Sequence, residues 1–185
     1  MSKITLSHSN AKNYFYVSPL SEKIRLKDFD CSLIEYNDYL LKDALRAKKD
    51  HIALTWLLID CANEKVAAYM SLIMDAIKLS FTEKELHSLS YPFRTIPAMK
   101  IAKLAVNSDY SKKYKGIGTF MIDTAERFAL ACNEDYCAAR FLTVDADIEH
   151  DEGVLAFYRK NGFIPNSELL NKNRKTISMR KDIYQ

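Results

Sequence analysis

The stretch from Ala98 to Gly118 reads AMKIAKLAVNSDYSKKYKGIG, and it decides how the rest of the chain is interpreted. Residues 98–106 are apolar except for two lysines, and we expect them to form a β-strand. Residues 107–115 are polar and are expected to be a turn that carries Lys112, Lys113 and Lys115. Apolar residues then recur at helical spacing, so the stretch predicts a strand, a loop and a helix. These residues are Phe120, Met121, Ala125, Phe128, Ala129 and Cys132.

The loop holds two of the chain's 4 glycines, Gly116 and Gly118, in one tripeptide. At an ordinary frequency, a chain of this length would contain roughly 13 glycines. A glycine backbone can approach a ligand closely, and the first N–H groups of a helix bind anions. We therefore expect a phosphate or pyrophosphate site here, and we expect a side chain at either glycine to abolish binding while leaving the fold standing. The simpler alternative is that the glycines only turn the chain into the helix.

Two common nucleotide-binding motifs are excluded. The P-loop pattern GxxxxGK[ST] is absent, and Met121 stands where a dinucleotide-binding fingerprint would need a third glycine.

The pattern K-x-x-G-x-G after an apolar strand resembles the acyl-CoA-binding motif of the GNAT acyltransferase superfamily, Q/R-x-x-G-x-G/A. Lys113 stands where that family has Gln or Arg, which keeps a positive donor but loses the planar fork. Residues 157–163, FYRKNGF, match the family's F-Y-x-x-x-G-F signature. Phe29-Asp30-Cys31 resembles the F-D-C-G start of a subgroup, with Ser32 in place of the glycine. That subgroup includes the acetylating toxins of bacterial toxin–antitoxin modules, which modify aminoacyl-tRNA.

The resemblance covers residues 26–179, and it implies an α+β fold. A central mixed sheet, mostly antiparallel and with splayed middle strands, would be flanked by helices. It also implies acetyl-CoA as co-substrate, with the acyl arm lying along Leu104, Ala105 and Val106. The N–H near Val106 would face the thioester carbonyl, and the side chains of Leu104 and Val106 would belong to the sheet core. The pyrophosphate would rest on backbone amides from Lys113, Tyr114, Lys115, Gly116, Ile117, Gly118 and Thr119.

Tyr158 is the catalytic residue that the resemblance implies, because the family uses a tyrosine at this position to donate a proton to the departing thiolate. Without the motif, a tyrosine on an apolar helix face would be read as core. A general base is left open, and some members of the family need none. The candidates are Asp75, Glu83, Glu85, His87, Asp145, His150 and Asp151.

Outward from this stretch, residues 31–48 have the spacing of an amphipathic helix that Asp30 or Ser32 could cap. Two apolar runs, 52–59 and 65–79, predict a β-hairpin. Residues 81–90 are expected to be a short helix or a surface loop, with a capping box that starts at Thr82. Near the C-terminus we expect a strand over 140–145 and a helix over 153–161 that ends at Gly162. Two final strands are expected at 163–164 and 176–179.

With 185 residues and no linker-like tract, the chain is expected to be a single GNAT domain, 1–185, with residues 1–20 as a poorly defined extension. With a net charge of only +3, basic and acidic residues are too evenly matched for a protein whose main role is to neutralise the phosphates of a nucleic acid. Cys31, Cys61, Cys132 and Cys137 lack metal-ligand spacing, so we expect reduced thiols and no metal. No signal peptide or membrane span is recognised, and a cytoplasmic location is expected.

The leading functional hypothesis is an N-acetyltransferase that moves an acetyl group from acetyl-CoA to a primary amine by direct attack in a ternary complex. The acceptor could be a small molecule, a peptide or aminoacyl-tRNA. One alternative is a toxin that acetylates aminoacyl-tRNA and has an antitoxin partner. Another is a non-catalytic module that binds acyl-CoA or a protein. A homodimer is possible, and no membrane partner is expected.

Overall fold

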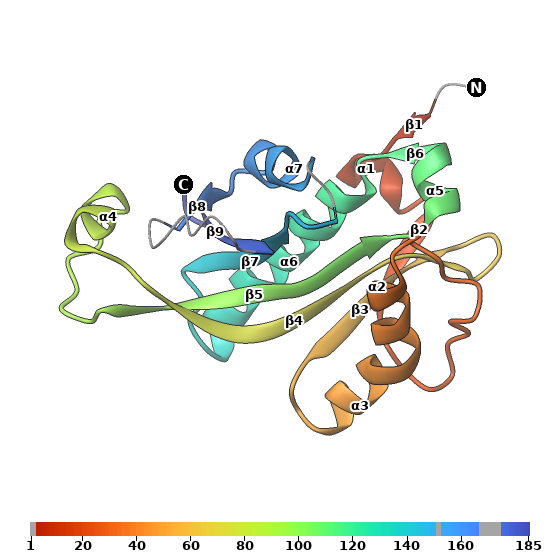
Figure 1. The fold of residues 1–185 in the computed structure, drawn as a ribbon, viewed down its shortest axis with the longest axis horizontal. Helices are drawn as coiled ribbons and strands as arrows, with labels where there is room; N and C mark the ends of the chain where they lie inside the picture. Colours follow the sequence, from red (N-terminus) through yellow and green to blue (C-terminus); the bar gives the residue numbers. More distant parts are fainter. Residues whose placement is uncertain (1–2, 151–152, 167–174) are drawn as a thin grey trace. The chain divides into compact units, whose positions relative to one another are not determined.

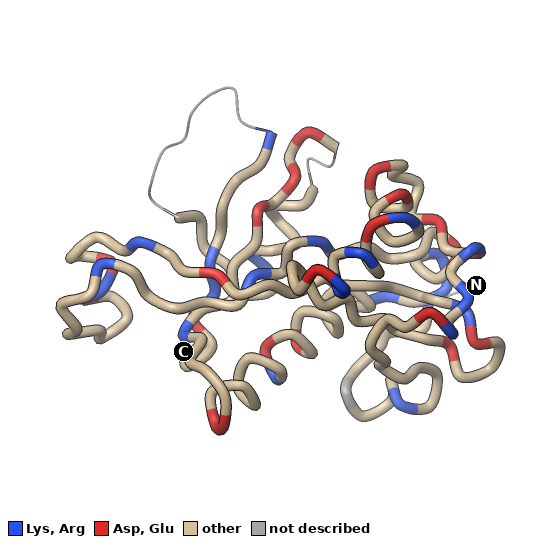
Figure 2. Tube along the Cα trace, turned by 90° about the horizontal axis from the view of Figure 1, so that it is seen from below, with Lys and Arg blue, Asp and Glu red and all other residues tan. Residues whose placement is uncertain are grey.

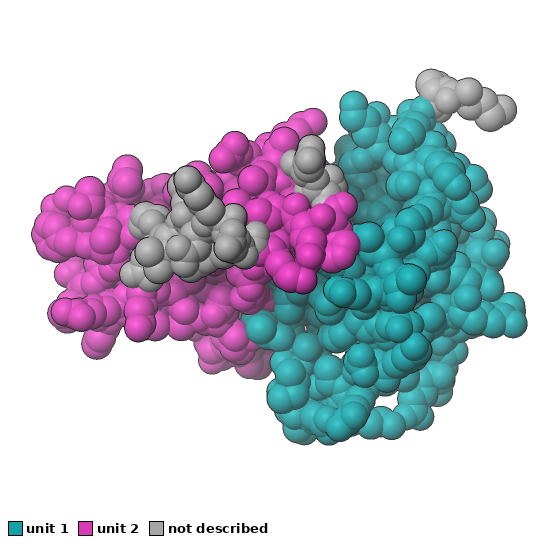
Figure 3. Space-filling model, in the orientation of Figure 1, with its two compact units in different colours: residues 1–73, 101–124 teal, residues 74–100, 125–185 magenta. Residues whose placement is uncertain are grey.

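The chain is described by a computed structural model that places residues 3–150, 153–166 and 175–185. It divides into two compact units, coloured separately in Figure 3. Unit 1 comprises residues 1–73 and 101–124, and unit 2 comprises residues 74–100 and 125–185. The single-domain expectation stays a prediction, and each unit is described by itself.

Most strands belong to one seven-stranded sheet with the order β2-β3-β4-β5-β7-β9-β8 (Figure 1). The pairs β2–β3, β3–β4, β7–β9 and β8–β9 are antiparallel, which confirms the expected mostly antiparallel sheet. Its strands are β2 (Phe15–Pro19), β3 (Leu54–Asp60), β4 (Val66–Lys78), β5 (Thr95–Val106), β7 (Phe141–Asp147), β8 (Ile164–Pro165) and β9 (Thr176–Asp182). A separate parallel pair joins β1 (Ile4–Thr5) to β6 (Tyr114–Lys115).

The predicted hairpin is present as β3 and β4. Its register places Leu57 opposite Tyr69, and both side chains are fully buried. The polar turn between the strands, residues 61–65, separates two runs that are too apolar to remain in solvent. The sequence pattern therefore predicted this element correctly.

The predicted helix over 31–48 begins later, at Ile34. It consists of α2 (Ile34–Asp38), a π-helical turn η1 (Tyr39–Asp43) and α3 (Ala44–Lys49). The expected cap is wrong, because the N-cap residue is Leu33 and no side chain caps the helix. The Asp30 carboxylate instead accepts hydrogen bonds from the Ser32 N–H and from Asn37 Nδ2, both at 2.8 Å.

The core of unit 1 lies between this helical segment and the sheet. Leu40 and Ala44 from the helix pack with Tyr69 and Ala105 from the strands, and Phe29 closes the cluster from the preceding loop. Burial of these apolar side chains is the main stabilising contribution, and it fixes the strand β5 beneath the helix.

In unit 2, β4 and β5 are connected through the short helix α4 (Phe81–Leu86). The expected capping box exists, but it is formed by Ser80 and Glu83 rather than starting at Thr82. Ser80 can act as the cap because its backbone is extended, whereas Thr82 already lies inside the helix.

Four further helices complete the described chain: α1 (His8–Ala11), α5 (Ser108–Lys113), α6 (Ile117–Asp135) and α7 (Val154–Lys160). Met121, Ile122, Ala125 and Ala129 of α6 are buried. Gly162 follows α7 with a φ of +85°, as predicted for a residue that ends a helix.

Candidate functional site

The segment after β5 is more ordered than the expected polar turn. It contains the helix α5 (Ser108–Lys113), the short strand β6 and then Gly116, after which α6 begins. Asn107 starts this path, because its side-chain oxygen accepts the Asp109 N–H at 3.0 Å and caps α5. Its amide nitrogen also donates to the Asp28 carbonyl at 3.2 Å, so a single buried residue joins three segments.

The end of β5 directs alternate backbone groups to opposite edges. The Asn107 N–H donates to Ala67 of β4 at 2.9 Å. Because successive residues of a strand point to opposite edges, the N–H groups of Val106 and Leu104 are directed away from β4. The expected place of the Leu104 and Val106 side chains in the sheet core is wrong, because both are only half-buried, whereas Ala105 between them is buried in the core of unit 1.

Gly116 is required by the architecture of the loop itself. Its φ is +93°, and a Cβ built on it would lie 3.3 Å from the Leu6 carbonyl oxygen. The N-terminal segment approaches this closely because Leu6 N–H donates to the Lys115 carbonyl at 2.8 Å, next to the β1–β6 pair. The simple chain-turning reading therefore applies to Gly116, and a side chain there would strain the loop.

The first turn of α6 has backbone N–H groups of the kind that bind anions. The Phe120 N–H is the first to bond within the helix, to the Gly116 carbonyl at 2.9 Å. The N–H groups of Ile117, Gly118 and Thr119 precede it and have no acceptor within the helix. With 19 residues, α6 also has a full macrodipole that favours negative charge at this end.

Four lysines lie in the segments that precede or pair with this part of the loop. Lys112, Lys113 and Lys115 are exposed. Lys112 pairs with Asp109 at 3.2 Å, and the Lys113 ammonium lies 6.0 Å from the Tyr110 ring centroid. Lys3 comes from the other end of the chain and donates to the Ser111 carbonyl at 2.8 Å. Sequence reasoning missed Lys3, because nothing in the sequence indicates that β1 pairs with β6.

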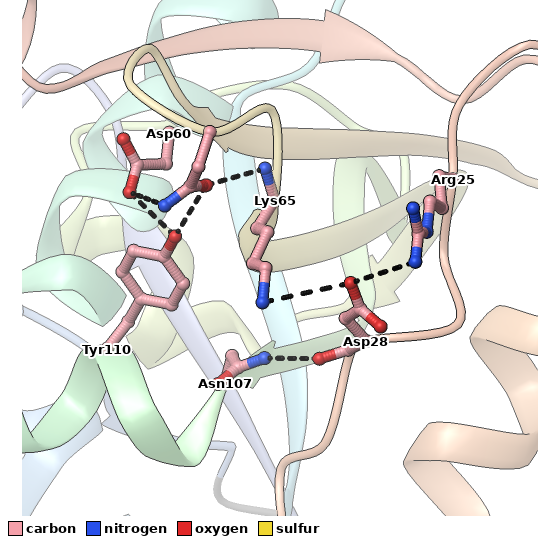
Figure 4. A network of polar contacts seen from close by, with 7 residues as sticks. Arg25, Asp28, Asp60, Lys65, Asn107 and Tyr110 are labelled. Atoms are coloured by element: carbon pink, nitrogen blue, oxygen red, sulfur yellow. Dashed lines mark hydrogen bonds and ion pairs between the residues drawn. The ribbon is translucent and has the colours of Figure 1, made fainter.

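A polar network anchors α5 to the β3–β4 turn (Figure 4). The Tyr110 hydroxyl donates to Asp60 at 2.7 Å, and Asn63 bonds the same carboxylate at 2.9 Å. Burial, followed by the hydrogen bond to Asp60, raises the pKa of Tyr110 above its ordinary value, so the phenol stays protonated as a donor. Lys65 lies 3.8 Å from Asp28, which extends the network to the 25–30 loop.

The F-D-C segment also contacts this region. The Ser108 N–H, at the start of α5, donates to the Asp30 carbonyl at 2.7 Å, and the hydroxyls of Ser32 and Ser108 lie 2.8 Å apart. Ser32 has a φ of +67°, which explains why the related motif has a glycine there. The hydrogen bonds from Ser32 and Asn37 lower the pKa of Asp30, so its carboxylate is charged at neutral pH.

Tyr158 belongs to unit 2, whereas the loop residues 104–106 and 113–119 belong to unit 1. Tyr158 lies on α7 and is 7% exposed. Its ring contacts Phe157 and Phe163, with centroid distances of 5.1 and 5.4 Å. The FYRKNGF motif therefore forms a local aromatic cluster around Tyr158.

The general-base candidates all lie in unit 2 and have different surroundings. Glu83 and His87 are buried and have structural partners, Arg180 at 3.0 Å and Asp182 at 2.8 Å. Asp75 accepts the Thr143 hydroxyl at 2.6 Å, and Asp145 pairs with Lys100 at 2.5 Å. His150 contacts Asp147 at 2.9 Å, and Glu85 is exposed. Asp151 lies outside the described residues.

Burial raises the pKa of Asp147, but the hydrogen bond and charge of His150 outweigh this effect, so the pKa of Asp147 is lowered.

The described side chains include no group of three or more His, Cys, Asp or Glu residues arranged to hold a metal ion. None of the helices in the described part of the chain has the length and apolar character that a membrane crossing requires. Basic and acidic residues are interspersed along the chain, as Figure 2 shows.

Comparison with known proteins identifies the fold. No family model matches the sequence, and no curated protein matches it. Solved structures do match, and they show that the chain has the fold of the GNAT acetyltransferase toxins.

Among the similar structures is AtaT complexed with acetyl-methionyl-tRNAfMet, with a TM-score of 0.75 and 19% identity over 92% of this chain and 95% of that chain. AtaT with its antitoxin AtaR and bound acetyl-CoA matches at a TM-score of 0.70, with 20% identity over 91% and 94% of the two chains. A variant of KacT matches at 0.71, with 18% identity over 90% and 95%.

Proposed function

We propose that this chain is an N-acetyltransferase that transfers the acetyl group of acetyl-CoA to the amino group of aminoacyl-tRNA. The observation that carries the proposal is the loop after β5. There, the N–H groups at the start of α6, which have no acceptor within the helix, follow Gly116 and a segment with three exposed lysines. The loop belongs to a fold whose relatives include AtaT, of which structures contain acetyl-CoA and acetyl-methionyl-tRNA.

The residues of the loop suit the chemical groups of acetyl-CoA. The backbone amides of residues 113–119, with Lys113 as the side-chain donor, would hold the diphosphate. The edge of β5 at Leu104–Val106 would bind the acyl-bearing arm through its backbone groups. The Val106 N–H would stabilise the oxyanion that forms at the thioester carbonyl, an effect worth about 3 kcal/mol for one good donor.

Tyr158 would act on the leaving group. When a neutral amine attacks the thioester carbon, the C–N bond forms and the C–S bond breaks, and the departing CoA thiolate needs a proton. A phenol keeps its proton at neutral pH and can donate it to the sulfur, and the proton that the attacking nitrogen loses when the amide forms restores the phenol. Structures of tyrosine-to-phenylalanine variants exist for both AtaT and KacT, and the same type of substitution, made at Tyr158, is the test here.

The experiment measures acetyl transfer from radiolabelled acetyl-CoA to a mixture of aminoacyl-tRNAs by the purified chain. We expect Tyr158→Phe to lower turnover about 100-fold or more, because it removes a general acid, and to leave acetyl-CoA affinity unchanged. Tyr136→Phe is the matched control, because Tyr136 is 85% exposed and belongs to the same unit. The same pair can be expressed in cells, where wild type and Tyr136→Phe should arrest growth and Tyr158→Phe should not.

Equal turnover by wild type and Tyr158→Phe would remove Tyr158 from its role. Acetylation of polyamines or peptides, but not of aminoacyl-tRNA, would support the broader N-acetyltransferase reading with another acceptor. If the chain binds acetyl-CoA but transfers the acetyl group to none of the acceptors tested, the non-catalytic module would be the better description. An antitoxin protein is proposed as a further partner, because AtaT has been solved bound to AtaR.

A further inference from the structure

A lysine on β5 is held between two tyrosine rings. The Lys103 ammonium lies 4.6 Å from the Tyr36 ring centroid and 5.2 Å from that of Tyr39. Both rings come from the helical segment α2–η1 over the unit 1 part of the sheet, and Tyr39 stacks on the buried Tyr69 at 6.2 Å. Cation–π attraction therefore fixes where the ammonium lies and limits its motion.

Lys103 is half-buried and has no carboxylate partner among the described residues. Asp38, which precedes Tyr39 in the sequence, pairs with Lys42 at 2.8 Å. Lysine side chains that are shielded from solvent are ordinarily paired with an anion, because removing an ammonium group from water costs free energy. The faces of the tyrosine rings attract its charge but leave its N–H donors available for an anion.

The position of Lys103 along β5 indicates which anion this is. The loop that we assign to the acetyl-CoA diphosphate, 113–119, follows the C-terminal end of β5, and the acyl group is assigned to Leu104–Val106. Lys103 precedes the acyl edge, on the side away from the diphosphate loop. An anion at Lys103 therefore belongs to the acceptor.

In aminoacyl-tRNA, the amino acid is esterified to the ribose of the 3′-terminal nucleotide, so the phosphate of that nucleotide is the anion nearest the reacting amine. We infer that Lys103, clamped by Tyr36 and Tyr39, binds a phosphate at the 3′ end of the acceptor RNA and selects nucleic-acid-linked amines over free ones. This inference rests on the proposed function and deepens it, because it names a specificity-determining residue of the same site.

The test compares Lys103→Met with Lys42→Met, which makes the same change at an exposed lysine of the adjacent η1. Affinity for aminoacyl-tRNA is measured by filter binding between about 50 and 200 mM salt, and affinity for acetyl-CoA by calorimetry. We expect Lys103→Met to weaken tRNA binding about tenfold, and the slope of log K against log salt should decrease in magnitude by about 0.7, as for one lost single-strand phosphate contact. Lys42→Met should change neither quantity, and Lys103→Arg should restore the slope.

In steady-state transfer, Lys103→Met should raise the KM for aminoacyl-tRNA about tenfold and leave kcat unchanged, because the contact is made equally in the ground and transition states. Unchanged tRNA affinity and salt slope in Lys103→Met would overturn the inference while the proposed function stands. Weakened acetyl-CoA binding with normal tRNA binding would assign the clamp to CoA phosphates instead and would also overturn it. If wild type binds acetyl-CoA but not aminoacyl-tRNA, the proposed acceptor is wrong and the inference fails with it.

Discussion

At the residue scale, the two glycines of the loop have different physical roles. Gly116 has a positive φ and lies against the Leu6 carbonyl, so it is needed to build the β1–β6 contact. Gly118 lies within the first turn of α6, where an ordinary residue can adopt the helical backbone. The sequence showed that both glycines are unusual. Only the structure shows that Gly116 has the positive φ that shapes the loop, whereas Gly118 belongs to the first turn of the helix.

Replacing each glycine with alanine should therefore affect the free energy of unfolding differently. Gly116→Ala is expected to lower the free energy of unfolding by about 1 to 2 kcal/mol, because a side chain at positive φ is strained and its Cβ crowds Leu6. Gly118→Ala should leave stability unchanged or raise it by up to about 1 kcal/mol, because alanine is the better helix former. Urea denaturation of both variants checks this expectation, and equal effects would contradict it.

At the element scale, α4 buries polar residues and exposes apolar ones. Glu83 and His87 are buried, whereas Phe81 and Leu86 are 77% and 69% exposed. The helix is held in unit 2 by β9, through Glu83 with Arg180 at 3.0 Å and His87 with Asp182 at 2.8 Å. Buried polar contacts, of which Glu83–Arg180 is an ion pair, therefore attach this element to the sheet.

Breaking one of these pairs should destabilise the chain strongly. In Glu83→Gln, Arg180, whose side chain is 3% exposed, loses its carboxylate partner, and we expect a loss of about 3 kcal/mol. Glu85→Gln is the control, since Glu85 is exposed on the same helix and should change stability by less than about 0.5 kcal/mol. Thermal unfolding of both variants measures the difference in stability. A decrease of less than about 1 kcal/mol in the free energy of unfolding of Glu83→Gln would show that the Glu83–Arg180 pair contributes little to stability.

The elements that sequence reasoning predicted are those with a strong apolar period. The β3–β4 hairpin, β5, α6 and β7 follow from runs of buried residues. The helix α5 was expected to be a turn, because Ser108, Asp109 and the lysines after them have no apolar period. Its stability comes from the Asn107 cap and the Tyr110–Asp60 hydrogen bond, which joins residues 50 positions apart. Such distant polar contacts cannot be read from a single sequence.

At the scale of the whole molecule, the motifs identified the fold although no family model or curated protein matches the sequence. The structural matches cover about nine-tenths of the chain at 14 to 20% identity. The fold is thus shared although the sequences are largely different, and the residues of the two motifs are those that indicated it. The N-terminal segment is a part of the candidate site that the sequence did not indicate, because nothing in the sequence shows that β1 pairs with β6.

The central claim is that the loop after β5 binds acetyl-CoA, and calorimetric titration of acetyl-CoA tests it most directly. Wild type should bind with a measurable heat, and Gly118→Asp should remain folded but lose binding, because a carboxylate would occupy the place of a phosphate. Aspartate is tolerated in the first turn of a helix, so the fold should survive. Ala131→Asp, at an exposed position of the same α6, should bind as wild type does. No binding by wild type at millimolar acetyl-CoA, or equal binding by folded Gly118→Asp, would contradict the account.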